Sequence, residues 1–196
     1  MAETADKLHL DAAILAAMAA QTAAYLDNDR ILFWPLAAPT MPRLTLGGFL
    51  LRRHRLVALF DLLPPTEQAT VQAAMAVFNQ ALEGRTVRFE KKAQRELASR
   101  IRQWAAGMGD YLAEARRGRG SQAFLATTME VRAMIAALME ELSSYPYHLD
   151  RTLVSRVAEL DRQLRGRWVR GPFIWPESWA PAYPADQFWW LYGQGR

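Results

Sequence analysis

The most unusual chemically capable side chains lie in the stretch LLRRHRL, residues 50–56, where three arginines and a histidine interrupt an apolar run. A guanidinium group is costly to bury without a partner, so each must meet water, a carboxylate or an anionic ligand. One interpretation is pairing with Asp or Glu of a neighbouring helix. The functional alternative is a site for an anionic partner, made by Arg52, Arg53, His54 and Arg55.

A second concentration of positive charge covers residues 85–119, which hold ten basic and four acidic residues. Spacings of three and four place several of these bases on one stripe of a helix. A solvent-facing stripe would contact a phosphate backbone, with an affinity that falls steeply with salt. The alternative is neutralisation by acidic helices packed alongside, because the charge alternates in sign along the chain. The candidate anion-binding or nucleic-acid-binding residues are Arg85, Arg88, Lys92 and Arg95, with Lys91 and Arg102 on the same face, and Arg116, Arg117 and Arg119 at the next turn.

The last part of the chain, residues 171–196, is rich in tryptophan and proline, and we call it the C-terminal strap. Its prolines argue against a regular helix before about residue 184, and a short helix is predicted over 185–192. The strap either folds back over the helices or offers an aromatic patch to a partner. Tryptophan beside arginine also makes a platform for stacking bases. The candidate partner-binding residues are Trp175, Trp179, Trp189 and Trp190.

The sequence contains no motif for metal or nucleotide chemistry that its context supports. The histidines have no HExxH or ExxH spacing, and Asp150, near His148, is better explained as the cap of a helix that starts at 151. The segment 118–123 matches GxGxxA, but a long helix precedes it where a dinucleotide site needs a strand. The absence of cysteine excludes disulfides, thiolate metal sites and a cysteine nucleophile. We expect no metal, no cofactor and no catalytic residue.

Helices must position these groups. Apolar residues at spacings of three and four predict helices over 8–26, 49–63, 66–84, 86–116, 122–143 and 151–165. The pattern between Ala93 and Leu164 predicts one shared buried seam. Three prolines make residues 30–46 an extended segment, and Gly47 and Gly48 are expected to form a flexible joint after it. The predicted fold is therefore all-α, an antiparallel bundle-like domain of about six helices over 1–170, with the strap packed on it or on a partner.

The chain of 196 residues is 51% hydrophobic with a formal net charge of +4, which suits one globular domain. The longest uncharged run near the start is too short to cross a bilayer, and the acidic residues before it are wrong for a secretion leader. We expect a cytoplasmic protein. The first functional hypothesis is a non-enzymatic interaction or adaptor subunit that binds a protein partner or itself. The alternatives are a sequence-tolerant nucleic-acid binder, and a small-ligand protein or enzyme with a cavity near His54.

Overall fold

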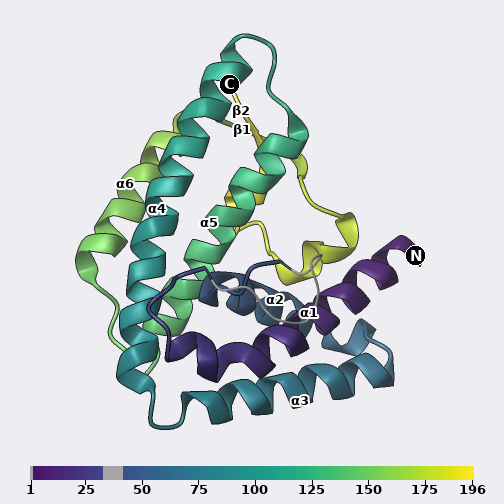
Figure 1. Ribbon diagram of the computed structural model, residues 1–196. Coiled ribbons are helices and arrows are strands. Elements are labelled where there is room, and N and C mark those ends of the chain that lie inside the picture. The colour runs from purple at the N-terminus through teal and green to yellow at the C-terminus, as the bar shows by residue number, and fades with distance from the viewer. Residues whose placement is uncertain (1, 33–41) are drawn as a thin grey trace.

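The computed structural model describes residues 2–32 and 42–196, and this part of the chain is mostly helical (Figure 1). The α-helices confirm the predicted all-α class with about six helices. A small antiparallel sheet and short 3-10 helices complete the structure. In chain order the elements are α1 (Ala2–Leu26), α2 (Leu46–Ala58), η1 (Phe60–Leu62), α3 (Pro65–Leu82), α4 (Thr86–Arg116), α5 (Gln122–Leu142), α6 (Arg151–Arg165), β1 (Trp168–Phe173), η2 (Glu177–Ala182), η3 (Trp189–Leu191) and β2 (Tyr192–Gly195).

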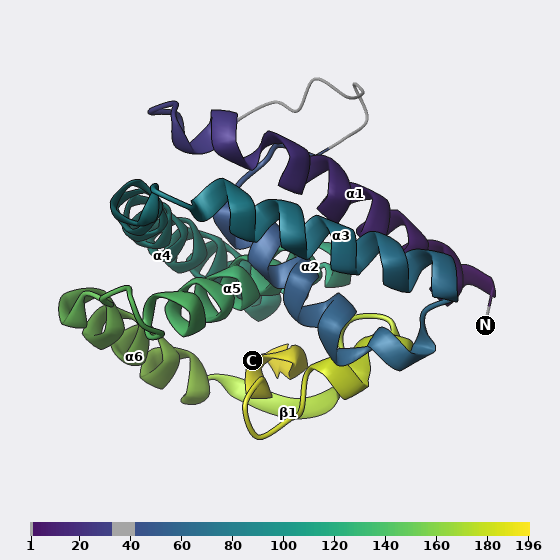
Figure 2. The ribbon, with the colours of Figure 1, turned by 90° about the horizontal axis from the view of Figure 1, so that it is seen from below.

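The helices are arranged around α2. Helices α1 and α3 pack against each other and cover one side of α2, whereas α5 packs on another side (Figure 2). Helices α4 and α5 form an antiparallel pair joined by the turn at the top of Figure 1, and α6 packs along α4. Because α2 contacts α1, α4, α5 and η2, the arginines of its sequence lie where several elements meet.

The predicted apolar seam forms the centre of the structure. Leu97 and Ile101 of α4 and Ile135 and Leu138 of α5 are all buried, as their spacing predicts. One continuous core cluster includes residues from every α-helix and from the C-terminal strap. The cap expected for α6 is also present, since the Asp150 side chain accepts a hydrogen bond from the Thr152 amide at 2.7 Å.

The strap differs from its prediction at its end. The expected helix over 185–192 is wrong, because the chain there forms the 3-10 turn η3 and then the strand β2, which pairs with β1. The strand pairing depends on Gly193, whose φ of 138° favours glycine. A Cβ atom at Gly193 would lie 2.1 Å from the Val169 carbonyl oxygen.

The start of α2 also differs from its prediction. Gly47 and Gly48 are not a flexible joint: they are buried in the first turn of α2, after the N-cap Thr45. The helix predicted over 49–63 ends as an α-helix at Ala58 and continues as η1. Of the extended segment predicted over 30–46, residues 33–41 lie outside the described part of the chain, and Leu46 already belongs to α2.

Candidate anion-binding site

The arginines of the 50–56 stretch each meet a carboxylate of another helix. Asp11 of α1 lies between two of them, with one carboxylate oxygen bonded to Arg55 and the other 3.2 Å from Arg52 Nε. Arg53 donates to Glu141 of α5. Asp11 and Arg55 are both buried, so the ion pair is shielded from water. The structure therefore places these arginines at helix–helix contacts, as the pairing interpretation expected.

His54 joins α2 to the strap. Its Nε2 lies 2.8 Å from the Ala182 carbonyl oxygen, which can only accept, so this nitrogen carries the proton. Its ring also packs against Tyr183 and Phe188. A pocket of about 510 Å³ lies beside His54, between α2, α3 and α5, and Glu140 lines it with Nδ1 of His54 4.0 Å from its carboxylate. The structure thus has a pocket beside His54, and the small-ligand or enzymatic function that such a pocket could serve stays a prediction.

Arginines of the helical part hold the strap by stacking on its tryptophans. The guanidinium carbon of Arg55 lies 3.5 Å from the centre of the Trp179 ring, and Arg55 Nε donates to the Tyr183 hydroxyl at 3.1 Å. Burial raises the pKa of Tyr183, which keeps its hydroxyl protonated. Cation–π contacts of this kind gain strength where water is excluded.

A second contact of this type was missed in the sequence. Arg132 of α5 makes a two-bond ion pair with Asp161 of α6, at 3.1 and 2.8 Å, and stacks on Trp190 with 3.9 Å to the ring centre. Arg132 is a charged residue within the apolar sequence of α5, and it is buried. A charged residue within an apolar helix needs a partner inside the protein, and this feature of the sequence could have identified Arg132.

The four tryptophans proposed as partner-binding residues all pack on the core. Trp190 is buried, whereas Trp175, Trp179 and Trp189 are half-buried. Trp175 donates from its indole nitrogen to the Ala126 carbonyl oxygen at 3.3 Å. Trp189 lies at the edge of the strap, and it is the member of the set whose ring lines a pocket of about 400 Å³.

The basic residues near the start of α4 differ in their surroundings. Arg85 and Arg88 both bond to the Asp27 carboxylate at the end of α1, and the Arg85 contact lowers the pKa of Asp27. Lys92 does not share the solvent face predicted for it. It is buried, donates to the backbone carbonyl oxygens of Tyr25 and Asn28, and lies 3.8 Å from the centre of the Tyr25 ring. This contact joins α4 to the end of α1, because Tyr25 lies in the last turn of that helix and Asn28 lies just beyond it.

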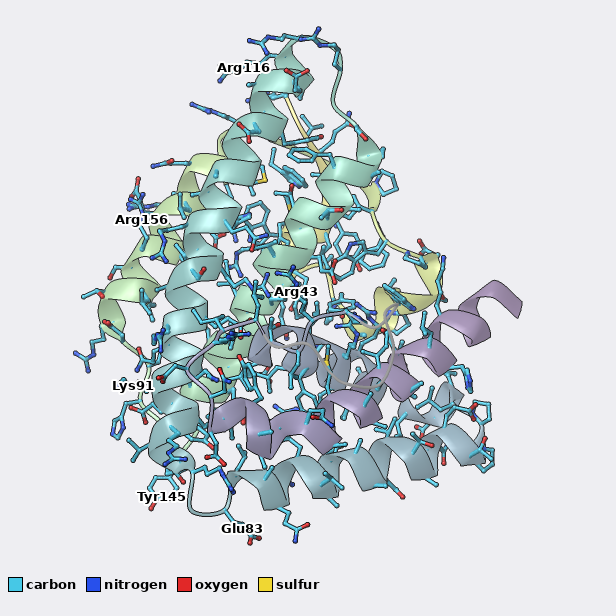
Figure 3. The ribbon with its side chains drawn as sticks, viewed as in Figure 1. Arg43, Glu83, Lys91, Arg116, Tyr145 and Arg156 are labelled. Atoms are coloured by element: carbon cyan, nitrogen blue, oxygen red, sulfur yellow. The ribbon has the colours of Figure 1, made fainter. Side chains whose placement is uncertain are left out.

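Lys91, Arg95 and Arg102 remain exposed on α4, and no carboxylate of the described residues pairs with them. The arginines at the turn after α4 are only partly available to bind an anion, because Glu114 pairs with Arg117 at 2.7 Å and with Arg119 at 3.0 Å. Arg116 has no such partner in the described chain and projects at the far end of the α4–α5 pair (Figure 3).

The largest group of basic residues without carboxylate partners among the described residues lies on α6, β1 and the turn between them, which the sequence reasoning did not select. Its signal was the excess of bases over acids in residues 151–170. Lys91 of α4 and Arg156 of α6 point outward on the same side of the molecule (Figure 3). The exposed arginines of this stretch that have no carboxylate partner among the described residues are Arg151, Arg156, Arg165, Arg167 and Arg170.

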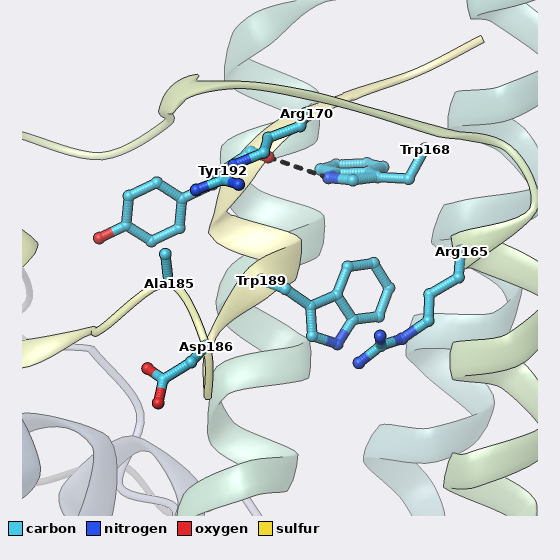
Figure 4. A pocket seen from close by; sticks show the side chains of 7 residues that line it. All are labelled: Arg165, Trp168, Arg170, Ala185, Asp186, Trp189 and Tyr192. Carbon is cyan, nitrogen blue, oxygen red and sulfur yellow. Dashed lines mark hydrogen bonds between the residues drawn. The ribbon is translucent and has the colours of Figure 1, made fainter.

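Two of these arginines reach the pocket drawn in Figure 4. Arg165 at the end of α6 lies 4.3 Å from the centre of the Trp189 ring, and Arg170 extends from β1 above it. Trp168 and Tyr192 complete the aromatic lining, and Trp168 Nε1 donates to the Tyr192 carbonyl oxygen at 3.2 Å. The site combines aromatic rings with two arginines that form no ion pair with a carboxylate of the described residues, although Asp186 lines the same pocket. Arginine and aromatic rings together are suited to holding planar anions.

A buried acid also escaped the sequence reasoning. Glu96 of α4 is fully buried and accepts hydrogen bonds from the backbone amides of Leu46 and Gly47, at 2.8 and 3.1 Å, so it caps the start of α2 from another helix. Arg100 approaches the same carboxylate at 3.3 Å. Burial raises the pKa of Glu96 above its usual value. These contacts give Glu96 a structural role.

Among the side chains that the structure describes, those of residues 7–32 and 42–196, no three acidic or histidine residues gather closely enough to coordinate a metal ion. Of the helices that the structure describes, none has both the length and the hydropathy needed to cross a bilayer.

The chain matches no protein-family model, no curated protein and no solved structure.

Proposed function

We propose that this protein binds nucleic acid without catalysis, through phosphate contacts made by the exposed arginines of α6 and β1 and the exposed bases of α4. The observation that supports this proposal most directly is the distribution of ion pairs. The arginines of α2 and α5 pair with carboxylates of other helices. By contrast, some basic residues of α4 and of the stretch 151–170 are exposed and have no carboxylate partner among the described residues: Lys91, Arg95, Arg102, Arg151, Arg156, Arg165, Arg167 and Arg170.

The chemistry of these side chains suits phosphate. Arginine presents a planar fork of donors that matches phosphate oxygens, and it stays charged at every physiological pH. Helix α6 has 15 residues, and at about 1.5 Å per residue it is about 22 Å long. This length covers several consecutive phosphates of a strand, at about 3.4 Å of helix axis for each phosphate of one B-DNA strand. A surface of this kind carries no base readout, so the binding would tolerate many sequences.

The experiment is a salt titration of binding. Fluorescence anisotropy with a labelled oligonucleotide is expected to give an affinity that falls linearly with salt on logarithmic axes, with a slope near −0.7 to −0.9 for each phosphate contact. The double variant Arg156→Ala/Arg167→Ala should reduce the magnitude of this slope by about 1.5. No binding of single- or double-stranded oligonucleotides at ~50 mM salt would overturn the proposal.

The matched control is Arg117→Ala/Arg119→Ala, which also removes two arginines from the surface. Both of these side chains pair with Glu114, so they contribute less free positive charge than the α6 and β1 group. The control should leave the slope closer to that of the wild type. If both double variants weaken binding equally, the contact surface is not the one proposed.

A second candidate function is the interaction or adaptor role, and the outer face of α3 favours it. This helix has one charged residue, Glu67, and it exposes Ala69, Ala73, Ala76 and Val77 to solvent. Light scattering at several concentrations would show whether a second copy of the chain covers this face. A dimer that Ala73→Glu dissociates supports the role, and a wild-type monomer at all concentrations removes self-association.

A further inference from the structure

We infer that the pocket of Figure 4 is a base-stacking subsite for single-stranded nucleic acid, an inference that rests on the proposed function and gives it a strand preference. The pocket lies between the end of α6, strand β1 and the last part of the strap. Its volume is about 400 Å³, within the range of roughly 300–1,000 Å³ that is typical of ligand sites. The lining residues are Arg165, Trp168, Arg170, Ala185, Asp186, Trp189 and Tyr192.

The rings of the pocket offer surfaces for one planar base. Trp168 and Trp189 have ring centres 6.3 Å apart and planes at 85°, so the pocket presents differently oriented aromatic surfaces (Figure 4). Both rings and that of Tyr192 are only half-buried, which leaves part of each aromatic surface open to a ligand. A base that stacks on one indole can contact the edge of the other.

The charged groups of the pocket match the rest of a nucleotide. Arg165 and Arg170 are exposed and unpaired with any carboxylate of the described residues, so they can bind the phosphates on either side of the base. Asp186 lies at the opposite side of the pocket from Trp168 (Figure 4) and can accept a hydrogen bond from an N–H group of a base, such as the ring N3–H of thymine or uracil. The pocket thus holds cations, aromatic rings and an acceptor, which are the groups that can contact the phosphates and the base of a nucleotide.

The backbone around the pocket is held in place before any ligand arrives. The bond from Trp168 Nε1 to the Tyr192 carbonyl oxygen joins the two sides of the pocket, and the pairing of β1 with β2 supports the same connection. Trp189 packs at right angles on Trp190, which is fixed in the core. A preformed site loses little conformational entropy on binding. Because the bases of a duplex are already stacked on each other, only a single strand can place a base here without unstacking.

The test compares three probes of equal length at ~50 mM salt: oligo(dT), an abasic oligonucleotide with the same phosphates, and a duplex. The wild-type protein should bind oligo(dT) roughly 10-fold more tightly than the abasic strand, which is the factor expected for one stacked base. Trp189→Leu should reduce binding of oligo(dT) to the abasic level and leave abasic binding unchanged. Trp175→Leu, which removes a half-buried indole outside the pocket, should preserve the 10-fold ratio.

The outcomes separate the subsite from the proposed function. Equal binding of oligo(dT) and the abasic strand by the wild type overturns the subsite and leaves phosphate binding intact. No binding of any probe overturns both. If Trp189→Leu fails to fold, quenching of the wild-type tryptophan fluorescence decides: oligo(dT) should quench it and the abasic strand should not, and equal quenching overturns the subsite. Oligo(rU), used in parallel, shows whether the pocket prefers RNA or DNA.

Discussion

Arg55 of α2 and Trp179 of the C-terminal strap stack with 3.5 Å between the guanidinium carbon and the ring centre, while the same guanidinium pairs with Asp11 of α1. One side chain therefore joins three segments that are distant in sequence. Arg55 is buried, so its charge depends on Asp11 for compensation. The strap is held by an ion pair that lies beneath it as well as by its own apolar contacts.

The first prediction concerns this ion pair. Asp11→Asn keeps the shape of the side chain and removes its charge, which leaves Arg55 and Arg52 without their carboxylate. The free energy of unfolding should fall by about 3 kcal/mol, because removing one partner of a buried pair strands the other charge. Urea denaturation at neutral pH measures the change. Asp27→Asn is the matched control: its pairs with Arg85 and Arg88 are exposed, and a comparable loss of stability there would contradict the argument.

The second prediction concerns Arg132. Arg132→Lys keeps the charge but loses the fork of donors that holds both oxygens of Asp161 and the flat surface that stacks on Trp190. We expect a loss of about 1–3 kcal/mol in unfolding free energy. Arg162→Lys, on the exposed face of α6, should change stability little, because its partner Glu159 is on the same surface. Equal stability of wild type and Arg132→Lys would show that the stacked geometry contributes nothing.

The helices could be predicted because their positions follow from local spacing. Leu97 and Ile101 are about one helical turn apart, and so are Ile135 and Leu138. All four side chains are buried in the structure, as this spacing predicts. The end of α2 was less predictable, because an apolar run cannot distinguish a continuing α-helix from a 3-10 turn. Likewise, the strands β1 and β2 are separated by a long connection, so no hairpin turn marks their pairing.

The partners of the charged groups could not be predicted from spacing. Asp11 and Arg55 are 44 positions apart, and no local pattern states which acid meets which arginine. Arg132 carried a usable signal, since it is a charged residue within the apolar sequence of α5, whereas Glu96 stands among other charged residues of α4 and gives no such contrast. A buried charge must be satisfied internally, and Glu96 is satisfied by the first amides of α2.

The third prediction compares two glycines within helices. At Gly47, a Cβ atom would lie 2.9 Å from Glu96 Oε1 and 3.2 Å from Leu138 Cδ1, inside the core. Gly47→Ala should therefore destabilise the protein by about 1–3 kcal/mol. At Gly109 of α4 nothing lies within 4 Å, so Gly109→Ala should stabilise it by about 0.5–1 kcal/mol through its helix propensity. Thermal unfolding of both variants measures the signs, and a stable Gly47→Ala would mean that α2 does not approach α4 so closely.

The fourth prediction uses the pH dependence that Lys92 creates. Burial lowers its pKa from 10.5 to about 8. Between these values the unfolded chain binds more protons at this site than the folded chain, so the free energy of unfolding rises with pH. The gain between pH 7.5 and 9.5 should be about 1 kcal/mol after allowance for screening by solvent. The rise of the unfolding free energy should end below pH 10. Burial raises the pKa values of Tyr25 and Tyr183 in the folded chain, so above this pH their ionisation in the unfolded chain lowers the unfolding free energy.

Lys92→Met tests whether this amine is the source of the slope. Methionine has nearly the same length and carries no proton, so the variant should show a flat unfolding free energy between pH 7.5 and 9.5. It also loses the bonds to the carbonyl oxygens of Tyr25 and Asn28, which should lower its stability at both pH values. The deficit relative to the wild type should be larger at pH 9.5, because only the wild type gains stability as the pH rises. Lys91→Met, the exposed neighbour on α4, is the control and should keep the wild-type slope. A wild type whose stability falls over this range would show that the buried amine keeps its proton, held by the carbonyl groups at the end of α1.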